Sequence, residues 1–440
     1  MTRYWCELAW LGAERAEPGL VIETDGDKIA SLTRGVGTPP DDAERLDGLT
    51  LPGFANAHSH AFQRSLRGRT HGGQGSFWTW REQMYASLAG LDPDSYLPLA
   101  RATFAEMALA GITLVGEFHY VHRGPGGTPY LDANAMGNAV MEAARQAGVR
   151  ITLLDACYLH GGIGKEPEEP QKRFADRDAD AWLKRVETLT GGPAARIGAA
   201  IHSVRAVDPP SARKVAEWAG EREAPLHAHV SEQPMENEEC FAAYGATPTQ
   251  ILSEAGALSQ RFTAVHATHV SNGDVNLLGG EGAFCCLCPT TERDLADGIG
   301  PARRLREAGA YLALGSDSQA VIDPLEEARA VELDERLATG VRGQHRPPEL
   351  MRAATDCGYQ SLGWPEGGRI EEGALADLTT ISFESVRLAG TPPRHALESV
   401  VFAGSAVDVR HVMVGGEWIV RDGAHVRLHV AAELAAALAE

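Results

Sequence analysis

A chain of 440 residues is long enough to bury one large core together with a smaller second domain. Its formal net charge of −20 disfavours a nucleic-acid partner or an acidic membrane surface, because like charges would repel each other. The 7 cysteines are irregularly spaced, no apolar run reaches the ~20 residues that cross a bilayer, and the first residues lack the apolar stretch of a signal peptide. We therefore predict a cytoplasmic protein with reduced thiols.

Both ends of the chain have the alternating pattern of β-strands. LVIETDGDKIASL near the start and AVDVRHVMVGGEWIVRDGAHV near the end alternate apolar and polar residues around glycine turns. The middle of the chain lacks this pattern. We predict one small β-sandwich-like domain assembled from residues 1–50 and 366–430, followed by a C-terminal helix over residues 431–440.

Residues 51–365 alternate short apolar strands with helical segments. The helical segments are rich in Ala, Leu and Glu, and several end in glycine, a common helix terminator. The expected strands are GLTLPGFANAHSH, GITLVGEFHY, VRITLLDACY, ARIGAAIHS, APLHAHVSE, FTAVHATHV, GAFCCLCPT and AYLALGSDS. About eight such units over about 300 residues predict an α/β fold, a (β/α)8 TIM-type barrel that forms the catalytic domain. A doubly wound sheet would give the same alternation, but it would not explain why polar residues follow so many strand ends.

Three histidines and one aspartate stand at the ends of predicted barrel strands. His58 and His60 lie two residues apart at the end of the first strand, so their side chains point to the same face. His229 follows in PLHAHVSE, and Asp317 follows the apolar strand YLALGSD. A His-x-His pair alone is also typical of packing or surface histidines, but four such residues at strand ends favour one divalent metal ion. Three imidazoles and one carboxylate suit zinc, with an open position for water.

These motifs resemble those of the amidohydrolase superfamily along nearly the whole chain. The resemblance consists of HxH on the first strand, HVSE on the fifth, a histidine on the sixth and SD on the eighth, with GRIEEGALADLTTI and VMVGGEWIVRDG in the flanking β domain. It implies a metal-dependent hydrolase whose barrels often pair, so we expect a homodimer. Two-metal members carry a carbamylated lysine at the end of the fourth strand, where this sequence has His202. We therefore expect a single Zn²⁺ per chain.

Hydrolysis of a C–N bond also requires a proton on the departing nitrogen. By resemblance to the deaminase branch of the superfamily, Glu232 in HVSE would carry a proton from water to the leaving amine, and Asp317 would accept a proton from the water. His266 would orient the water without binding the metal. Two alternatives stay open. Glu232 could belong to a solvated acidic helix, and His269 competes with His266 for the same role.

Three cysteines in GAFCCLC have the appearance of a soft-metal cluster. Cys285, Cys286 and Cys288 lie inside an apolar strand, however, where small thiols commonly serve as core residues. We therefore predict that they pack in the core of the barrel and bind no metal.

Polar side chains near the predicted barrel mouth indicate the kind of substrate. Gln63 follows the first strand, and Tyr120 follows the second. His202 and Arg205 follow the fourth strand, and Arg81 lies in the aromatic segment FWTWREQMY. A surface position is the ordinary one for any single arginine, but two arginines at one pocket suit a carboxylate gripped through the guanidinium fork. We expect a small anionic substrate derived from an amino acid.

Within the superfamily, the motifs HSHAFQR, SFWTWREQMY, EFHY, IHSVR and HVSE resemble the formimidoylglutamate deiminase family. Members of that family hydrolyse the imino group of N-formimino-L-glutamate, a compound of histidine degradation, and give N-formyl-L-glutamate and ammonia. The resemblance implies that Arg81, His202 and Arg205 hold the substrate carboxylates, with Gln63 and Tyr120 near the formimino end or the carbon chain. The alternatives are deamination of a guanine-like or other heterocyclic amine, amide hydrolysis on an acylated amino acid, and a non-catalytic barrel scaffold. A scaffold would be expected to lose ligands that are all present here.

Overall fold

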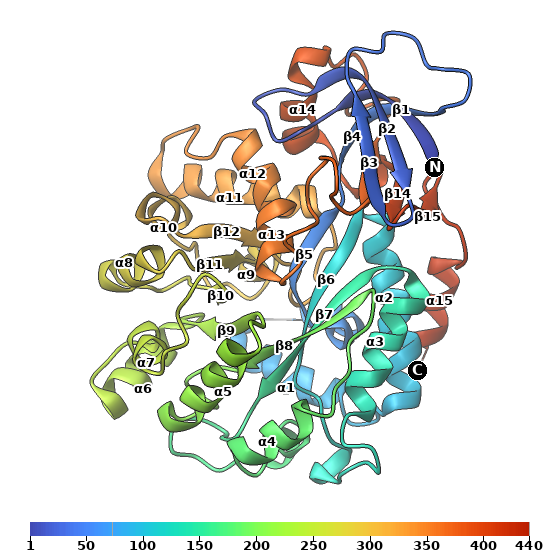
Figure 1. Cartoon of the computed structure of the whole chain (residues 1–440). Coiled ribbons are helices and arrows are strands. Elements are labelled where there is room, and N and C mark those ends of the chain that lie inside the picture. Colours follow the sequence, from blue (N-terminus) through green and yellow to red (C-terminus); the bar gives the residue numbers. More distant parts are fainter. Residues whose placement is uncertain (73, 440) are drawn as a thin grey trace.

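The computed structural model of the chain describes residues 1–72 and 74–439 and contains two eight-stranded sheets (Figure 1). One of them is parallel throughout and follows chain order, so that each strand pairs with the next. Its strands are β5 (Phe54–Ser59), β6 (Ile112–His119), β7 (Arg150–Cys157), β8 (Ala195–Ile201), β9 (Leu226–Val230), β10 (Phe262–His266), β11 (Phe284–Leu287) and β12 (Tyr311–Leu314). The predicted barrel fold is confirmed.

The barrel closes between its first and last strands at their carboxyl ends. A parallel bridge joins Ser59 to Asp317, beyond the end of β12. The N–H of His60 donates to the carbonyl of Asp317 at 3.1 Å, and the N–H of Asp317 donates to the carbonyl of His58 at 3.0 Å. The closure therefore links the backbone of the residues that the sequence analysis selected as metal ligands.

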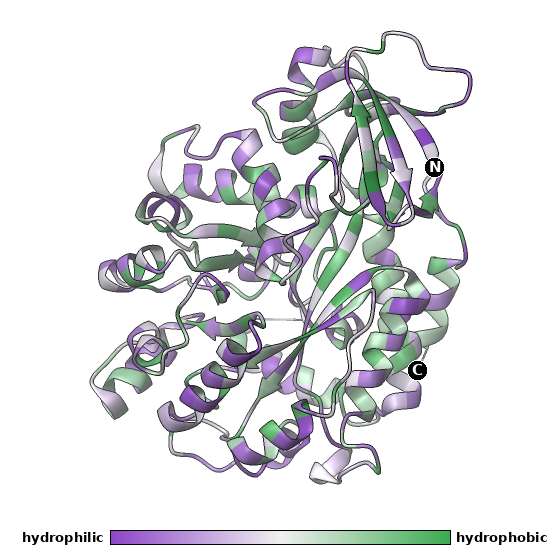
Figure 2. Ribbon diagram, viewed as in Figure 1, coloured by the Kyte–Doolittle hydropathy of each residue, from purple (hydrophilic) through white to green (hydrophobic). Residues whose placement is uncertain are grey.

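Helices cover the outside of the barrel (Figure 1). In α3 (Ala135–Ala147), Gly148 ends the helix with a φ of 82°, as expected of a glycine terminator. The barrel strands are buried almost throughout, whereas the helices carry both hydrophilic and hydrophobic colours in Figure 2. Among the described residues, no helix combines the length and the apolar character that crossing a bilayer requires. The other helices are α1 (Phe77–Ser87), α2 (Pro93–Leu109), α4 (Ala179–Val186), α5 (Pro209–Glu221), α6 (Pro234–Tyr244), α7 (Pro248–Glu254), α8 (Asn272–Gly280), α9 (Pro289–Asp294), α10 (Ala302–Ala308), α11 (Pro324–Thr339), α12 (Pro347–Ala354), α13 (Asp356–Ser361) and α14 (Ala396–Ala403).

Strands from both ends of the chain form the second sheet, as predicted. They are β1 (Thr2–Ala9), β2 (Glu17–Asp25), β3 (Lys28–Thr33), β4 (Glu44–Pro52), β13 (Leu378–Ile381), β14 (Val409–Val414), β15 (Glu417–Arg421) and β16 (Ala424–His425). They lie in the order β16-β15-β14-β13-β4-β1-β2-β3, with β1 and β4 parallel and the other neighbours antiparallel. The expected first barrel strand is divided, because β4 ends in this sheet and β5 begins in the barrel, with Gly53 between them.

The C-terminal helix is α15 (Val430–Ala437), which packs against α2 (Figure 1). Glu433 on α15 accepts a hydrogen bond from Nε of Arg101 on α2 at 3.1 Å. The predicted helix spanned residues 431–440, of which residue 440 lies outside the described part of the chain.

A buried ion pair joins the two sheets. Arg150, the first residue of β7, donates from Nε to Asp377 at 2.8 Å, and neither side chain is more than 5% exposed. The same carboxylate accepts hydrogen bonds from the hydroxyl of Tyr359 at 2.8 Å and from the N–H of Gly415 at 2.7 Å. Buried charges persist where they are paired and hydrogen-bonded. Asp377 therefore anchors the second sheet at the amino ends of the barrel strands, away from the candidate ligands.

Candidate active site

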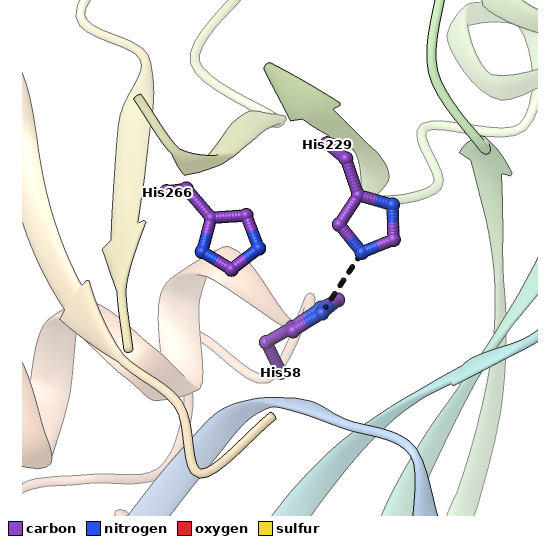
Figure 3. A group of neighbouring side chains, drawn as sticks. All are labelled: His58, His229 and His266. Carbon is purple, nitrogen blue, oxygen red and sulfur yellow. Dashed lines mark hydrogen bonds between the residues drawn. The ribbon is translucent and has the colours of Figure 1, made fainter. Parts of the chain in front are cut away.

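Three imidazoles and one carboxylate meet at the carboxyl ends of the barrel strands. Nε2 of His58 lies 3.3 Å from Oδ1 of Asp317, and Nε2 of His60 lies 3.4 Å from the same oxygen. Nε2 of His229 lies 3.2 Å from Nε2 of His58 (Figure 3). Around a zinc ion with Zn–N distances of about 2.0–2.1 Å, tetrahedral ligand atoms lie about 3.3 Å apart. The spacing of these donor atoms therefore fits one metal ion.

Backbone carbonyls orient two of these histidines. Nδ1 of His60 donates to the carbonyl of Phe118, and Nδ1 of His229 donates to the carbonyl of His202, both at 2.8 Å. The Nε2 lone pairs are thereby directed at the common centre. Burial lowers the pKa of His58 to about 3 and also lowers the pKa values of His60 and His229. These imidazoles are therefore neutral, which is the form that binds a metal.

Asp317 has an unusual backbone conformation. Its φ is 42°, in the left-handed region that side chains other than glycine rarely adopt. The side-chain amide of Gln319 donates a hydrogen bond to the backbone carbonyl of Asp317 at 2.9 Å and helps to hold this turn. Burial alone would raise the pKa of Asp317, but the hydrogen bond from His58 and the positive charge of His266 lower it below its usual value. An ionised carboxylate therefore faces the histidines.

His266 lies beside His58 and His229 (Figure 3). It also faces three carboxylates. Its Nε2 is 3.8 Å from Oδ2 of Asp317 and 3.9 Å from Oε1 of Glu232. Its Nδ1 is 3.3 Å from Oε1 of Glu292. Burial alone would lower the pKa of His266, but Glu232 and the other two carboxylates raise it to about 10. A cationic ring here can donate a hydrogen bond to an oxygen atom at the centre of the site.

The structure shows where the residues of the two open alternatives lie, namely His269 as a substitute for His266, and Glu232 as part of a solvated helix. Nε2 of His269 donates to the carbonyl of Asp297 at 2.7 Å, and His269 is not among the residues that line the cavity described below. Glu232 precedes α6 and is only 6% exposed, so it is not part of a solvated acidic face. These positions favour His266 and Glu232 as the functional residues.

A cavity opens above the metal-ligand candidates. Its volume is about 220 Å³, far more than the about 10–15 Å³ that one water molecule needs. The five predicted substrate contacts all line it: Gln63, Arg81, Tyr120, His202 and Arg205. The predicted metal and proton-transfer residues line it as well, namely His60, His229, Glu232, His266 and Asp317. His58 is fully buried and contacts Asp317. The structure therefore brings all the predicted site residues together.

One part of the cavity wall combines hydrogen-bonding groups with aromatic rings. Gln63, on the 3-10 helix Ala61–Leu66, donates to the hydroxyl of Tyr120 at 3.1 Å. The ring of His202 packs edge-on against Tyr158, with centroids 4.6 Å apart. These polar groups are held by ring packing, which restricts the directions in which they can contact a substrate.

The two arginines of the wall differ in their surroundings. Arg81 lies on α1, and its Cζ is 4.6 Å from the centre of the Trp78 ring. Arg205 lies in the loop after β8, with Nη2 3.2 Å from Glu232 and Nε 3.8 Å from Glu236. The ion pair between Glu232, the predicted proton carrier, and Arg205, a predicted carboxylate contact, was not predicted from the sequence.

Other residues of the site were not predicted from the sequence. Glu292 lies on α9, directly after β11, and its contact with His266 places it beside the centre. Its position after a barrel strand was a usable signal of the same kind that selected Asp317. Most of the aromatic lining was missed as well, namely Phe77, Trp78, Trp80, Tyr85, Tyr158 and Phe174. The segment FWTW was a signal for part of it.

The cysteines of β11 and its end are buried. Cys286 and Cys288 pack against small apolar side chains inside the barrel, as their predicted core role requires. Cys288 also forms a group with His266 and Glu292 whose atoms could bind a cation. In that group, however, the carboxylate of Glu292 already accepts a hydrogen bond from the N–H of Cys288 at 2.9 Å.

A separate group of metal-binding residue types lies outside the cavity. It consists of His119, His122 and Asp155, all buried. Asp155 accepts hydrogen bonds from Arg185 at 2.6 Å and from Trp182 at 2.9 Å. The charge of this aspartate is therefore already balanced, and the adjacent guanidinium would repel a cation.

The fold and the site define a class of protein, a (β/α)8 barrel with candidate metal ligands at the carboxyl ends of its strands. Residues 49–419 match the amidohydrolase family. The chain belongs to this family, and its relatives indicate a hydrolase that acts on C–N bonds.

Three members of the family illustrate what this chain is similar to. The chain is 39% identical over 399 residues to the formimidoylglutamate deiminase of Pseudomonas aeruginosa, a match that covers 88% of this chain and 87% of the relative. It is 29% identical to the 8-oxoguanine deaminase of the same organism, with 96% and 93% of the two chains covered. The crystal structure of an amidohydrolase from Brucella melitensis superposes with a TM-score of 0.92 at 33% identity, over 100% of this chain and 99% of that one.

Proposed function

We propose that the protein hydrolyses N-formimino-L-glutamate to N-formyl-L-glutamate and ammonia in the degradation of histidine. The observation that carries this proposal is the composition of one cavity, in which Arg81 and Arg205 share a wall with Glu232 and the metal-ligand candidates. A substrate with two carboxylates and one amidine group matches this cavity, because the carboxylates can bind the arginines while the amidine faces Glu232 and the metal-ligand candidates. The name of the relative with 39% identity supports the same reaction.

The donor atoms described above fit one divalent ion, and we propose Zn²⁺. Neutral imidazoles and a carboxylate at this spacing suit zinc or another borderline first-row metal. His58, His60, His229 and Asp317 would hold the ion. When bound, it would activate a water molecule for attack near neutral pH.

Proton transfer would fall to the carboxylates beside the centre. In the overall reaction, the oxygen of water bonds to the amidine carbon, and both protons of that water end on the nitrogen that leaves as ammonia. Asp317 would accept the first proton of the water and pass it to the leaving nitrogen, and Glu232 would carry the second proton from the same water to that nitrogen. His266, within 4 Å of both carboxylates, would orient the water by hydrogen bonding.

The wall of the cavity would select the substrate. Arg81, His202 and Arg205 would bind the carboxylates, since a guanidinium matches the two oxygens of a carboxylate. Gln63 and Tyr120 form a hydrogen-bonded pair that would face the formimino end or the carbon chain.

Ammonia release from N-formimino-L-glutamate tests the proposal directly. Zinc-loaded protein should release ammonia and N-formyl-L-glutamate in equal amounts, and a chelator should stop the reaction. If demonstrably metal-loaded protein released no ammonia from this substrate, the proposed substrate would be wrong, although the family assignment would stand.

A second candidate function is deamination of a heterocyclic amine. Aromatic rings line much of the cavity, and such rings stack well on a planar heterocycle. The similarity to an 8-oxoguanine deaminase points the same way. A panel of guanine-like and other heterocyclic amines in the same ammonia assay separates the two candidates, because a wall built for a dicarboxylate should give little turnover of an uncharged base.

We also propose that the protein works as a homodimer in the cytoplasm, without a nucleic-acid or membrane partner. All 7 cysteines are free, and six of them are buried, which suits a reducing compartment. Light scattering of the purified protein tests the dimer, since a monomer has a mass of 47.0 kDa.

A further inference from the structure

A second buried carboxylate lies behind the cavity wall. Glu236 is in the first turn of α6 and is 1% exposed, whereas Glu232 borders the cavity. Both carboxylates face Arg205, Glu232 at 3.2 Å from Nη2 and Glu236 at 3.8 Å from Nε. The guanidinium therefore lies between one carboxylate on the cavity side and one on the protein side.

Glu236 contacts the backbone of the loop as well as Arg205. Its Oε2 accepts a hydrogen bond from the backbone N–H of Glu232 at 3.2 Å. Its place in the first turn of α6 also lets the positive end of the helix dipole stabilise its charge. The hydrogen bond lies beside Ser231, whose φ of 51° marks a constrained turn. Glu236 thus contacts both Arg205 and the backbone that carries the proposed proton carrier.

Arg205 and Glu236 each have a buried polar atom that forms no hydrogen bond among the described residues. These atoms are Nε of Arg205 and Oε1 of Glu236. A guanidinium that is only 13% exposed needs a counter-charge, because an unpaired buried charge is costly. If Glu232 were the sole counter-charge, binding Arg205 and transferring protons would compete for one carboxylate.

We propose that Glu236 is a positioning residue that holds Arg205 in the cavity wall, so that a substrate carboxylate can replace Glu232 on the guanidinium. Glu232 is then free to transfer protons. This inference rests on the proposed function, since it assigns the carboxylate of the substrate a role in releasing Glu232. It also explains why an arginine that already has a partner on the cavity side can serve as a substrate contact.

The test compares the metal-loaded full-length protein with the variants Glu236→Ala, Glu236→Gln and Glu238→Ala. Glu238 is exposed on the same helix and serves as the matched control. Calorimetry with N-formyl-L-glutamate measures binding of a dicarboxylate without turnover. We expect Glu236→Ala to raise its Kd about 10-fold or more, Glu236→Gln to lie between Ala and wild type because the amide oxygen still accepts hydrogen bonds, and Glu238→Ala to stay within about 2-fold.

Two further measurements separate positioning from a general structural role. Metal content and Tm should match wild type in Glu236→Gln, so that this variant decides the question even if the alanine variant does not fold. In a crystal structure of a Glu236 variant, the Arg205 guanidinium should shift away from its wild-type position between the two glutamates, with Glu232 as its remaining carboxylate partner.

The failure of this inference can be distinguished from the failure of the proposed function. If wild type turns over N-formimino-L-glutamate while the Glu236 variants bind the dicarboxylate as tightly as wild type, the inference is overturned and the function stands. If wild type has no such activity, the function fails, and the position of Arg205 in the variant crystal structure still decides the inference. An unmoved Arg205 overturns it.

Discussion

The floor and the wall of the cavity are built in different ways. The floor residues His58, His60, His229 and Asp317 lie on strands or directly after them, and backbone hydrogen bonds of the barrel closure link three of them. The wall residues lie on the 3-10 helix, on α1 and in the loop after β8, where aromatic rings and ion pairs hold them. The floor is therefore fixed by the main chain and the wall by side chains.

On the proposed function, this difference separates the residues of the reaction from those that select the substrate. The backbone of the floor cannot move without disturbing the barrel closure, whereas loops can vary while the scaffold stays the same. Relatives named for formimidoylglutamate and for 8-oxoguanine both match this chain over most of its length. Substitutions in the floor should therefore abolish the reaction, and substitutions in the wall should change the substrate affinity.

The largest effect is expected for Asp317→Asn. This change removes a candidate metal ligand and the candidate acceptor of the first proton together. We expect kcat/KM for N-formimino-L-glutamate to fall about 10⁴-fold or more, with a loss of bound zinc that atomic absorption measures. Asp422→Asn is the control, because Asp422 lies in the turn between β15 and β16 and its side chain is 70% exposed. Retention of full zinc content and activity in Asp317→Asn would remove this residue from the centre.

Glu232→Gln should lower activity without removing the metal. The amide keeps the size of the side chain and can still contact Arg205, but it can neither accept nor deliver the proton. We expect kcat to fall about 10³-fold, within the range for a positioned acid–base group, while zinc content stays at the wild-type value. Glu238→Gln makes the same chemical change on the exposed side of α6. If Glu232→Gln turned over substrate near the wild-type rate, another group would have to carry the proton.

The floor was predictable from the sequence because strand ends converge in a parallel barrel. Once His58, His60, His229 and Asp317 were each placed at a strand end, the topology alone predicted that they would meet. The bridge between Ser59 and Asp317, which sets their spacing, has no signal in the sequence.

Only the polar residues of the wall were predictable, and their contacts with one another were not. Arg205 and Glu236 are 31 positions apart in the chain, and their contact depends on how a loop and a helix start pack together. The break at Gly53 was not predictable either. One continuous apolar run supplies β4 to the second sheet and β5 to the barrel, so the pattern alone does not show where one strand ends and the next begins. Glu292 follows a barrel strand as Asp317 does, but its contact with His266 depends on the packing of α9, which the sequence does not show.

The smallest of these effects, and the one that best separates wall from floor, is expected for Arg205→Met. Methionine keeps much of the length and apolar packing of the side chain but removes the guanidinium. We expect KM for N-formimino-L-glutamate to rise about 10- to 100-fold, the value of one or two charged hydrogen bonds, with zinc content and Tm close to wild type. Arg213→Met, on the exposed face of α5, is the matched control and should leave KM unchanged. An unchanged KM in Arg205→Met would take this residue out of substrate binding, and a loss of zinc would mean that wall and floor are not independent after all.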